Sequence, residues 1–288
     1  MNELLTLALG AHGGLSRWNR FTALSAIGSI TGALWRFKST ADLLTQVSVE
    51  ALLHEQRVTT HLVGRSKRLL FTPHRVASET EDGRLLEARD DPRAAFSGHR
   101  PETAWDDLHV AYFNSCALWT YLTIPFLYTY PRFVTEELQL WREDGKTWRP
   151  LKATFPDSVA SHTREQVSYF GEDGLLRRHE YTVDIMDGAR GVNYASDYRD
   201  VDGILVPTKR RVFAYDDGKN KIPVPLLVAI DFDNIAFAGT PKPRMSTDDG
   251  SRSGFSPSCK SPISTCAASS ARAPELYKKR SNAWSLRP

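Results

Sequence analysis

Asp-Gly pairs divide this sequence of 288 residues into short segments, and they constrain its fold more than any other feature. Within residues 1–239 the pairs begin at residues 82, 144, 173, 187, 202 and 217, and the last four of these lie 14 or 15 residues apart. Between β-rich segments this dipeptide indicates a hairpin, because a type I′ turn needs φ > 0 at both central residues. We therefore expect antiparallel strands that follow one another along the chain, at 167–170, 175–184, 192–198, 204–215 and 226–237.

Earlier strands are expected at 23–38, 45–53, 56–62 and 67–72. Successive strands are not separated by a helical period, which argues against a parallel sheet with crossover helices. In the hairpin centred on Asp173-Gly174, residues whose numbers sum to about 347 should pair. The fold prediction is a mainly β protein with a strongly curved antiparallel sheet, an N-terminal helix and a central helical cover.

The first twenty residues predict a short helix, a break at Gly13-Gly14 and a further helical turn, together forming a packed cap. Glu3 stands where a secretion signal has basic residues, and the apolar run that follows is too short for one. We expect a cytoplasmic protein. Export remains the alternative if the start codon is mis-assigned.

The segment 101–133 is aromatic and contains no charged residue between Val110 and Pro131. Three interpretations compete: a transmembrane helix, a helix buried in the core, and two short helices that break near Pro125 and cover the sheet at about 101–131. The soluble interpretations are favoured because polar residues interrupt the run. Tyr112, Trp119 and Phe126 follow a spacing of seven, which keeps them on one helical face. We predict that these three side chains line any cavity beneath the cover and bind its ligand.

The last 49 residues differ in composition from the rest of the chain. Residues 240–288 contain eleven Ser and six Pro, and nine Lys and Arg against three Asp and Glu. Such a segment cannot bury enough apolar surface to offset its ordering entropy. We expect one folded domain at 1–239 and a disordered basic tail at 240–288, with a frameshifted or read-through end as the alternative. The body is mildly acidic, which argues against a nucleic-acid partner.

Sequence motifs give little support to catalysis. Three cysteines exclude a disulfide scaffold, and metal, nucleotide and Ser-nucleophile motifs are missing, so we expect no metal, no cofactor and no catalytic residue. His162 and His179 are the best histidine pair, although the expected register separates them. Cys116 is interpreted as a small buried hydrophobe. The possible acid–base carboxylates flank the aromatic segment and are more typical of capping or solvated groups: Asp106, Asp107, Glu136 and Glu137.

Two basic runs lie on expected strands, where neighbouring side chains point to opposite faces. They are Arg177-Arg178 and Lys209-Arg210-Arg211. An arginine that points inward could bind an anionic headgroup or a carboxylate. An exposed outer face is the favoured interpretation for these residues.

Two motifs resemble proteins with a LolA-like, lipoprotein-carrier-like fold, of an uncharacterised bacterial subgroup. The first is Ala11-His-Gly-Gly-Leu-Ser-Arg-Trp18, before the first long strand. The second lies in 194–211 and includes Asp202-Gly-Ile-Leu-Val-Pro-Thr-Lys209, followed by Val228-Ala-Ile-Asp-Phe-Asp-Asn-Ile235. The resemblance covers about 1–239. It implies a curved antiparallel half-barrel with a helical plug, and an apolar cavity that holds acyl chains in the carrier proteins.

Three functional hypotheses follow. The first is non-catalytic binding of an apolar or amphipathic small molecule, such as a lipid, because ligand pockets are mainly apolar with a few polar anchors. The second is an enzyme that uses a His/carboxylate pair in the same cavity. The third is a structural or partner-binding protein with a filled interior. The oligomeric state is left open.

Overall fold

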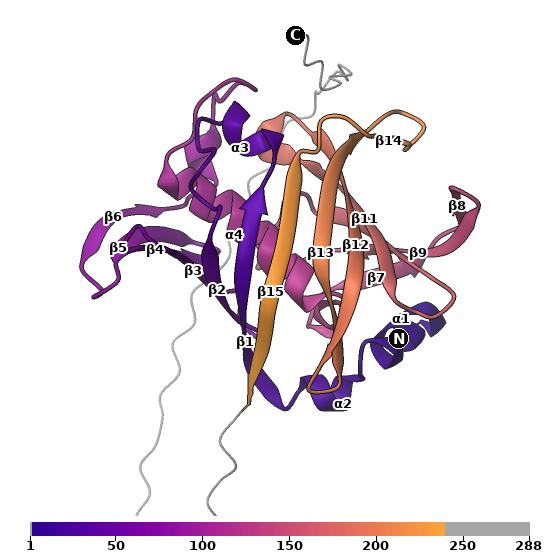
Figure 1. The fold of residues 1–288 in the computed structure, drawn as a ribbon. Coiled ribbons are helices and arrows are strands. Elements are labelled where there is room, and N and C mark those ends of the chain that lie inside the picture. The colour runs from indigo at the N-terminus through magenta and orange to yellow at the C-terminus, as the bar shows by residue number, and fades with distance from the viewer. Residues whose placement is uncertain (1, 240–288) are drawn as a thin grey trace, which may run out of the picture. The chain divides into compact units, whose positions relative to one another are not determined.

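The computed structural model describes residues 2–239, which form one open antiparallel sheet wrapped around a helix (Figure 1). The predicted tail, 240–288, lies outside the described residues. The strands are β1 (Phe21–Thr31), β2 (Val47–Leu52), β3 (Val58–Leu62), β4 (Lys67–Thr72), β5 (Arg75–Thr80), β6 (Leu85–Asp90), β7 (Val134–Glu137), β8 (Trp141–Glu143), β9 (Lys146–Thr154), β10 (Glu165–Phe170), β11 (Leu176–Val183), β12 (Ala189–Val201), β13 (Ile204–Tyr215), β14 (Lys221–Ile222) and β15 (Val228–Gly239).

The sheet order confirms the predicted mainly β, antiparallel fold. It runs β6-β5-β4-β3-β2-β1-β15-β13-β12-β11-β10-β9-β7, with β14 on β13 and β8 on β9. Strands that are adjacent in the sheet mostly also follow one another in the sequence, as a series of hairpins requires. The exception is β15, which lies between β1 and β13 and so joins two series of hairpins. The sheet curves but stays open, with β6 and β7 at its edges.

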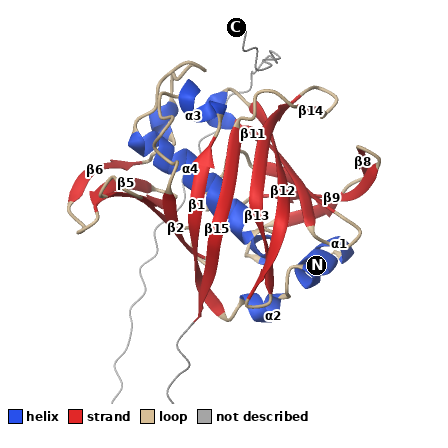
Figure 2. Cartoon of the chain, viewed as in Figure 1, coloured by secondary structure: helices blue, strands red, loops and turns tan. Residues whose placement is uncertain are grey.

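One long helix covers the concave face of this sheet (Figure 2). α4 (Asp107–Thr123) begins at Asp106, whose carboxylate accepts a hydrogen bond from the backbone N–H of His109 at 2.8 Å. Fourteen of its 17 residues are buried, as expected of a helix that is apolar on nearly all sides. Pro125 follows the helix, and the 3-10 turn η2 (Phe126–Thr129) continues the cover. This arrangement confirms the predicted helical cover with a break near Pro125. Among residues 2–239, no helix combines the length and apolar character needed to cross a membrane.

The N-terminal cap joins the two sequence motifs that carry the family resemblance. α1 (Glu3–Ala11) and α2 (Leu15–Trp18) meet at Gly13-Gly14, as predicted. A Cβ on Gly13 would lie 2.2 Å from the carbonyl oxygen of Gly203 in the β12–β13 turn, so only glycine fits this approach. Arg17 donates a hydrogen bond of 2.7 Å to that same carbonyl.

The sequence predicted the later strands more accurately than the strands in the first half of the chain. Ser168 pairs with His179 and Val167 with Glu180, so the register sum of 347 is confirmed. The strand expected at 23–38 was wrong beyond Thr31, because Gly32 at φ 126° turns the chain into α3 (Ala33–Phe37). Strands β5 to β9 were missed, since several are short and carry alternating charges rather than an apolar run. Two further 3-10 turns are η1 (Ala94–Phe96) and η3 (Asp184–Met186).

All six Asp-Gly pairs of residues 2–239 lie between consecutive strands, as predicted. Three of them, at 144–145, 187–188 and 202–203, have both residues at positive φ, as a type I′ turn requires. Gly174 has a φ of 76°, and its turn also packs on α1. A Cβ at this position would lie 2.9 Å from Cβ of Ala11. In contrast, nothing lies within 4 Å of a Cβ on Gly145, whose φ is 73°.

These two glycines give a matched pair for mutation. Gly145→Val should lower the free energy of unfolding by about 1 kcal/mol or more, because a β-branched residue resists positive φ. Gly174→Val should cost more, by about a further 1–3 kcal/mol, since it adds overpacking against α1. Denaturant unfolding of both variants measures the difference. Equal losses would show that the β10–β11 turn does not need its contact with α1.

Candidate functional site

A small cavity remains between α4 and the concave face of the sheet. Its volume is about 40 Å³, which is room for a few water molecules. The lining comes from α3, α4, η3 and strands β11, β12, β13 and β15, and it is mainly apolar. The lining residues of the cavity include Phe113, Tyr121, Tyr181, Val212 and Ile230.

The three aromatic residues predicted to bind a ligand are all buried, but their side chains have different neighbours. Tyr112 borders a separate, open cleft of about 320 Å³. The indole N–H of Trp119 donates to the carbonyl oxygen of Leu52 at 2.8 Å. Phe126 stacks on Trp18 with ring centroids 4.2 Å apart. The 40 Å³ cavity is therefore lined by other residues, and ligand contact by these three stays a prediction.

Arg210 is a buried arginine that the favoured sequence interpretation placed on the exposed surface. Only 2 % of the residue is exposed, and it points from β13 toward α4. One guanidinium nitrogen, Nη2, donates to the backbone carbonyl of Tyr121, whose ring centroid lies 4.8 Å from the guanidinium carbon. Nε and Nη1 have no hydrogen-bond partner in the part of the chain that the structure describes. Burial lowers the pKa of Arg210 from its usual value, yet a guanidinium stays charged at neutral pH.

Polar groups without acidic character surround Arg210. The hydroxyls of Tyr121 and Tyr181 share a hydrogen bond of 2.5 Å. Burial raises the pKa of both phenols, so they are neutral donors at physiological pH. Asn193 lies beside the Tyr121 hydroxyl on β12 and is fully buried, but neither its side-chain oxygen nor its nitrogen has hydrogen-bond geometry to any described group.

His179 belongs to a chain of hydrogen bonds across β10 and β11. Its Nε2 lies 2.7 Å from Oε1 of Gln166, and its Nδ1 lies 3.0 Å from the hydroxyl of Ser168. Gln166 can only accept through Oε1, so Nε2 carries the proton and Nδ1 accepts from Ser168. The Ser168 hydroxyl accepts in turn from Tyr128 at 2.7 Å. This satisfied chain fixes His179 as a neutral structural residue.

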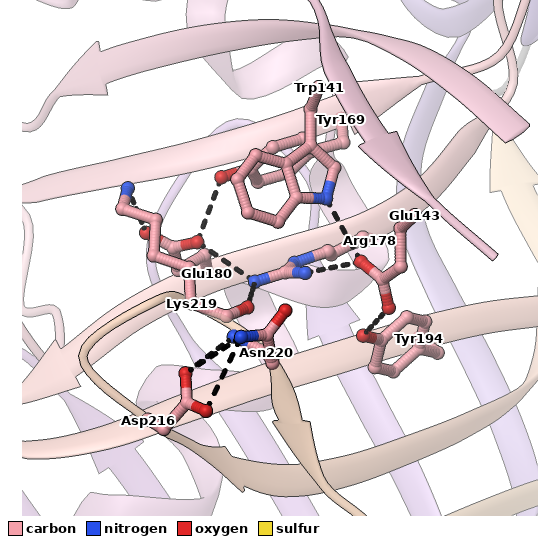
Figure 3. A network of polar contacts seen from close by, with 9 residues as sticks. All are labelled: Trp141, Glu143, Tyr169, Arg178, Glu180, Tyr194, Asp216, Lys219 and Asn220. Carbon is pink, nitrogen blue, oxygen red and sulfur yellow. Dashed lines mark hydrogen bonds and ion pairs between the residues drawn. The ribbon is translucent and has the colours of Figure 1, made fainter. Parts of the chain in front are cut away.

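The second buried arginine, Arg178, lies on the opposite face of the sheet and is paired with two carboxylates through Nη1 and Nη2, while its Nε has no hydrogen-bond partner among residues 2–239 (Figure 3). Its guanidinium bonds to Glu143 of β8, to Glu180 at 3.0 Å and to the carbonyl of Lys219 at 2.7 Å. Rings of Trp141, Tyr169 and Tyr194 lie 5.0 to 5.9 Å from it. The β8–β9 hairpin and the β13–β14 turn thus cover Arg178 from outside.

The remaining candidates have structural roles. Each of the four flanking carboxylates forms an ion pair: Asp106 with Arg89, Asp107 with Lys67, Glu136 with Lys152 and Glu137 with Arg149. Burial raises the pKa of the Cys116 thiol to about 12, as expected of a small buried hydrophobe. Within residues 2–239, no group of three or more His, Cys, Asp or Glu side chains is placed to hold a metal ion.

Three buried histidines are harder to protonate than a histidine in water. Burial lowers the pKa of His12 to about 4 and that of His162 and His179 to about 3. The register keeps His162 opposite Asp184, as predicted, but the rings of His162 and His179 both lie within 5.6 Å of Tyr181. His162 also stacks on Phe113 at 4.4 Å and leaves Nε2 without a partner.

These histidines predict acid sensitivity. Their unfolded-state pKa is about 6.5, so below that pH the unfolded chain binds protons that the folded chain does not. Stability is therefore complete above about pH 6.5 and falls toward pH 4, by up to about 1.4 kcal/mol per pH unit for each histidine. His162→Phe should reduce the slope of the unfolding free energy against pH by the contribution of about one proton. His74→Phe, at an exposed position, should not reduce it. Denaturant unfolding from pH 7.5 to 4.5 checks both variants, and an unchanged slope for His162→Phe would contradict the burial argument.

Similarity to known proteins is found among solved structures. No family model and no curated protein matches the sequence. Among solved structures, a LolA superfamily protein from Nitrosomonas europaea is similar over 81 % of this chain and 93 % of its own, with 9 % identity and a TM-score of 0.45. A DUF1329 family protein from Desulfovibrio piger matches over 81 % and 91 %, with 11 % identity and a TM-score of 0.45. A putative outer membrane lipoprotein-sorting protein domain from Vibrio parahaemolyticus matches over 84 % and 96 %, with 10 % identity and a TM-score of 0.41. One of these structures is a LolA superfamily protein, the family whose fold the two sequence motifs resemble.

Proposed function

We propose that the protein binds an apolar or amphipathic small molecule, such as a lipid, between α4 and the concave face of the sheet, without catalysis. One observation carries the proposal: a mainly apolar space with a few polar groups is kept beneath a helix whose other contacts are packed. This is the character of most small-molecule sites. The cytoplasmic location expected from the sequence is kept in this proposal as a prediction.

The same cavity supports the enzymatic hypothesis less well than it supports non-catalytic binding. The lining of the cavity contains one histidine, His162, and no Asp or Glu. A His/carboxylate pair for acid–base chemistry is therefore not assembled there, and His162 itself is neutral because burial depresses its pKa.

The size of the cavity implies movement on binding. At about 40 Å³ it is far smaller than the several hundred Å³ typical of ligand pockets. A lipid-sized molecule enters only if α4 or the side chains around the cavity shift. The third hypothesis, a filled interior without a ligand, therefore becomes a measurable alternative.

A cavity-filling variant tests binding. Ala117 on α4 lines the cavity and is half-buried, so Ala117→Phe places a ring in the space. We expect wild type to bind Nile red, a neutral apolar dye, and Ala117→Phe to bind it at least tenfold more weakly. Leu140→Phe, at a residue that is 62 % exposed, is the control and should bind like wild type. Fluorescence titration measures all three, and no dye binding by folded wild type would leave the structural hypothesis in its place.

Trp119→Ala tests the ligand contact predicted from the sequence. The residue is 1 % exposed and its indole is hydrogen-bonded, so we expect a loss of about 3–5 kcal/mol in unfolding free energy with little change in dye affinity. Urea unfolding and dye titration of the same variant give both quantities. The opposite result, a large loss of affinity with a small loss of stability, would place Trp119 in the wall of the binding site.

A further inference from the structure

We propose that Arg210 holds the acidic head of the ligand, so that the bound molecule is an amphiphile with a carboxylate or phosphate group. This inference rests on the proposed function and adds the chemical class of the ligand. It starts from a difference between the two buried arginines of the chain.

Arg178 and Arg210 are equally buried but differently partnered. Arg178 is bonded to two carboxylates, those of Glu143 and Glu180. Arg210 forms no ion pair with any Asp or Glu of residues 2–239, and two of its three nitrogens lack partners. A buried charge without a counter-charge is strongly unfavourable, and buried charges in proteins are as a rule paired. Residues 2–239 provide the anion for Arg178 and none for Arg210, and we infer that a ligand supplies the second one.

The groups around Arg210 suit an anion. Nε and Nη1 of the guanidinium are donors without a partner among residues 2–239. They lie on different edges of the group, and one of them can bind an acid group together with the second N–H of Nη2. Asn193 adds an amide N–H₂ beside the Tyr121 hydroxyl. One phenol of the Tyr121–Tyr181 pair donates its O–H to the other, so the pair keeps one O–H for a ligand. None of these groups is anionic.

Arg210 is not itself in the lining of the apolar cavity, but three of its neighbours are. Ile230 is the cross-strand partner of Arg210, Val212 lies two residues further along β13, and both line the cavity. Tyr121 contacts both sites, because its ring faces the guanidinium and also lines the cavity. An acidic head at Arg210 therefore leaves the tail of the ligand in the apolar space.

The test compares three ligands with the same tail. Dodecanoate, dodecyl phosphate and dodecan-1-ol are titrated below their micelle concentrations into the full-length protein, with binding followed by native mass spectrometry and calorimetry. We expect one or both of the acids to bind at least tenfold more tightly than the alcohol. Whichever acid binds more tightly identifies the headgroup.

Variants then assign the preference to Arg210. Arg210→Met should remove the preference for the acid and leave the affinity for dodecan-1-ol within about twofold. Arg211→Met is the control, because it makes the same change of charge on the neighbouring residue, which points to the other face and pairs with Asp231; it should keep the preference. If Arg210→Met does not fold, Arg210→Lys keeps a charge without the two-pronged guanidinium and should weaken acid binding at least threefold.

The outcomes separate the two proposals. Equal affinity for acids and alcohol, unchanged in Arg210→Met, would overturn the role of Arg210 and leave the proposed function standing. No binding of any of the three ligands, together with no binding of Nile red, would overturn both.

Discussion

A single open sheet has a concave face that no second sheet covers, and the rest of this structure depends on how that face is removed from water. α4 does so almost alone, since fourteen of its 17 residues are buried. The helix needs contacts on several sides, and the sheet curves around it to provide them (Figure 1). The cavity, the phenols and Arg210 all lie in the region where helix and sheet meet.

The two buried arginines show how the faces of one sheet differ. On the convex face, Arg178 is covered by two hairpins that bring their own carboxylate, carbonyl and aromatic rings (Figure 3). Breaking such a pair leaves a buried charge uncompensated, which makes the cluster a strong link between segments far apart in sequence. On the concave face, the partners of Arg210 among residues 2–239 are the carbonyl and ring of Tyr121. The arginine on the convex face thus stabilises the fold, whereas the arginine on the concave face carries the proposed recognition of an acid.

The sequence predicted what short-range chemistry controls. Asp-Gly turns, the register around Asp173-Gly174, the helical cover and its break near Pro125 all depend on local backbone preferences, and all are confirmed. The burial of Arg178 and Arg210 could not be predicted in the same way. Alternation along β13 shows that Arg210 differs in face from its neighbours, but not which face is buried, because that depends on β15 and α4 contacts from distant residues. The spacing of Tyr112, Trp119 and Phe126 likewise indicates a shared helical face and not the separate neighbours that each side chain has.

The place of β15 between β1 and β13 has a consequence for biosynthesis. Synthesis from the N-terminus produces β15 after all the other strands, and until then the hairpin series β1–β6 and β7–β13 each present an unpaired edge. Exposed edges can pair with other chains, so a nascent or prematurely terminated polypeptide carries two sites for aggregation that the complete sheet closes with one strand. The β1–β15 pairing spans about 200 residues, and such distant pairing slows folding, which lengthens the time for which both edges stay open.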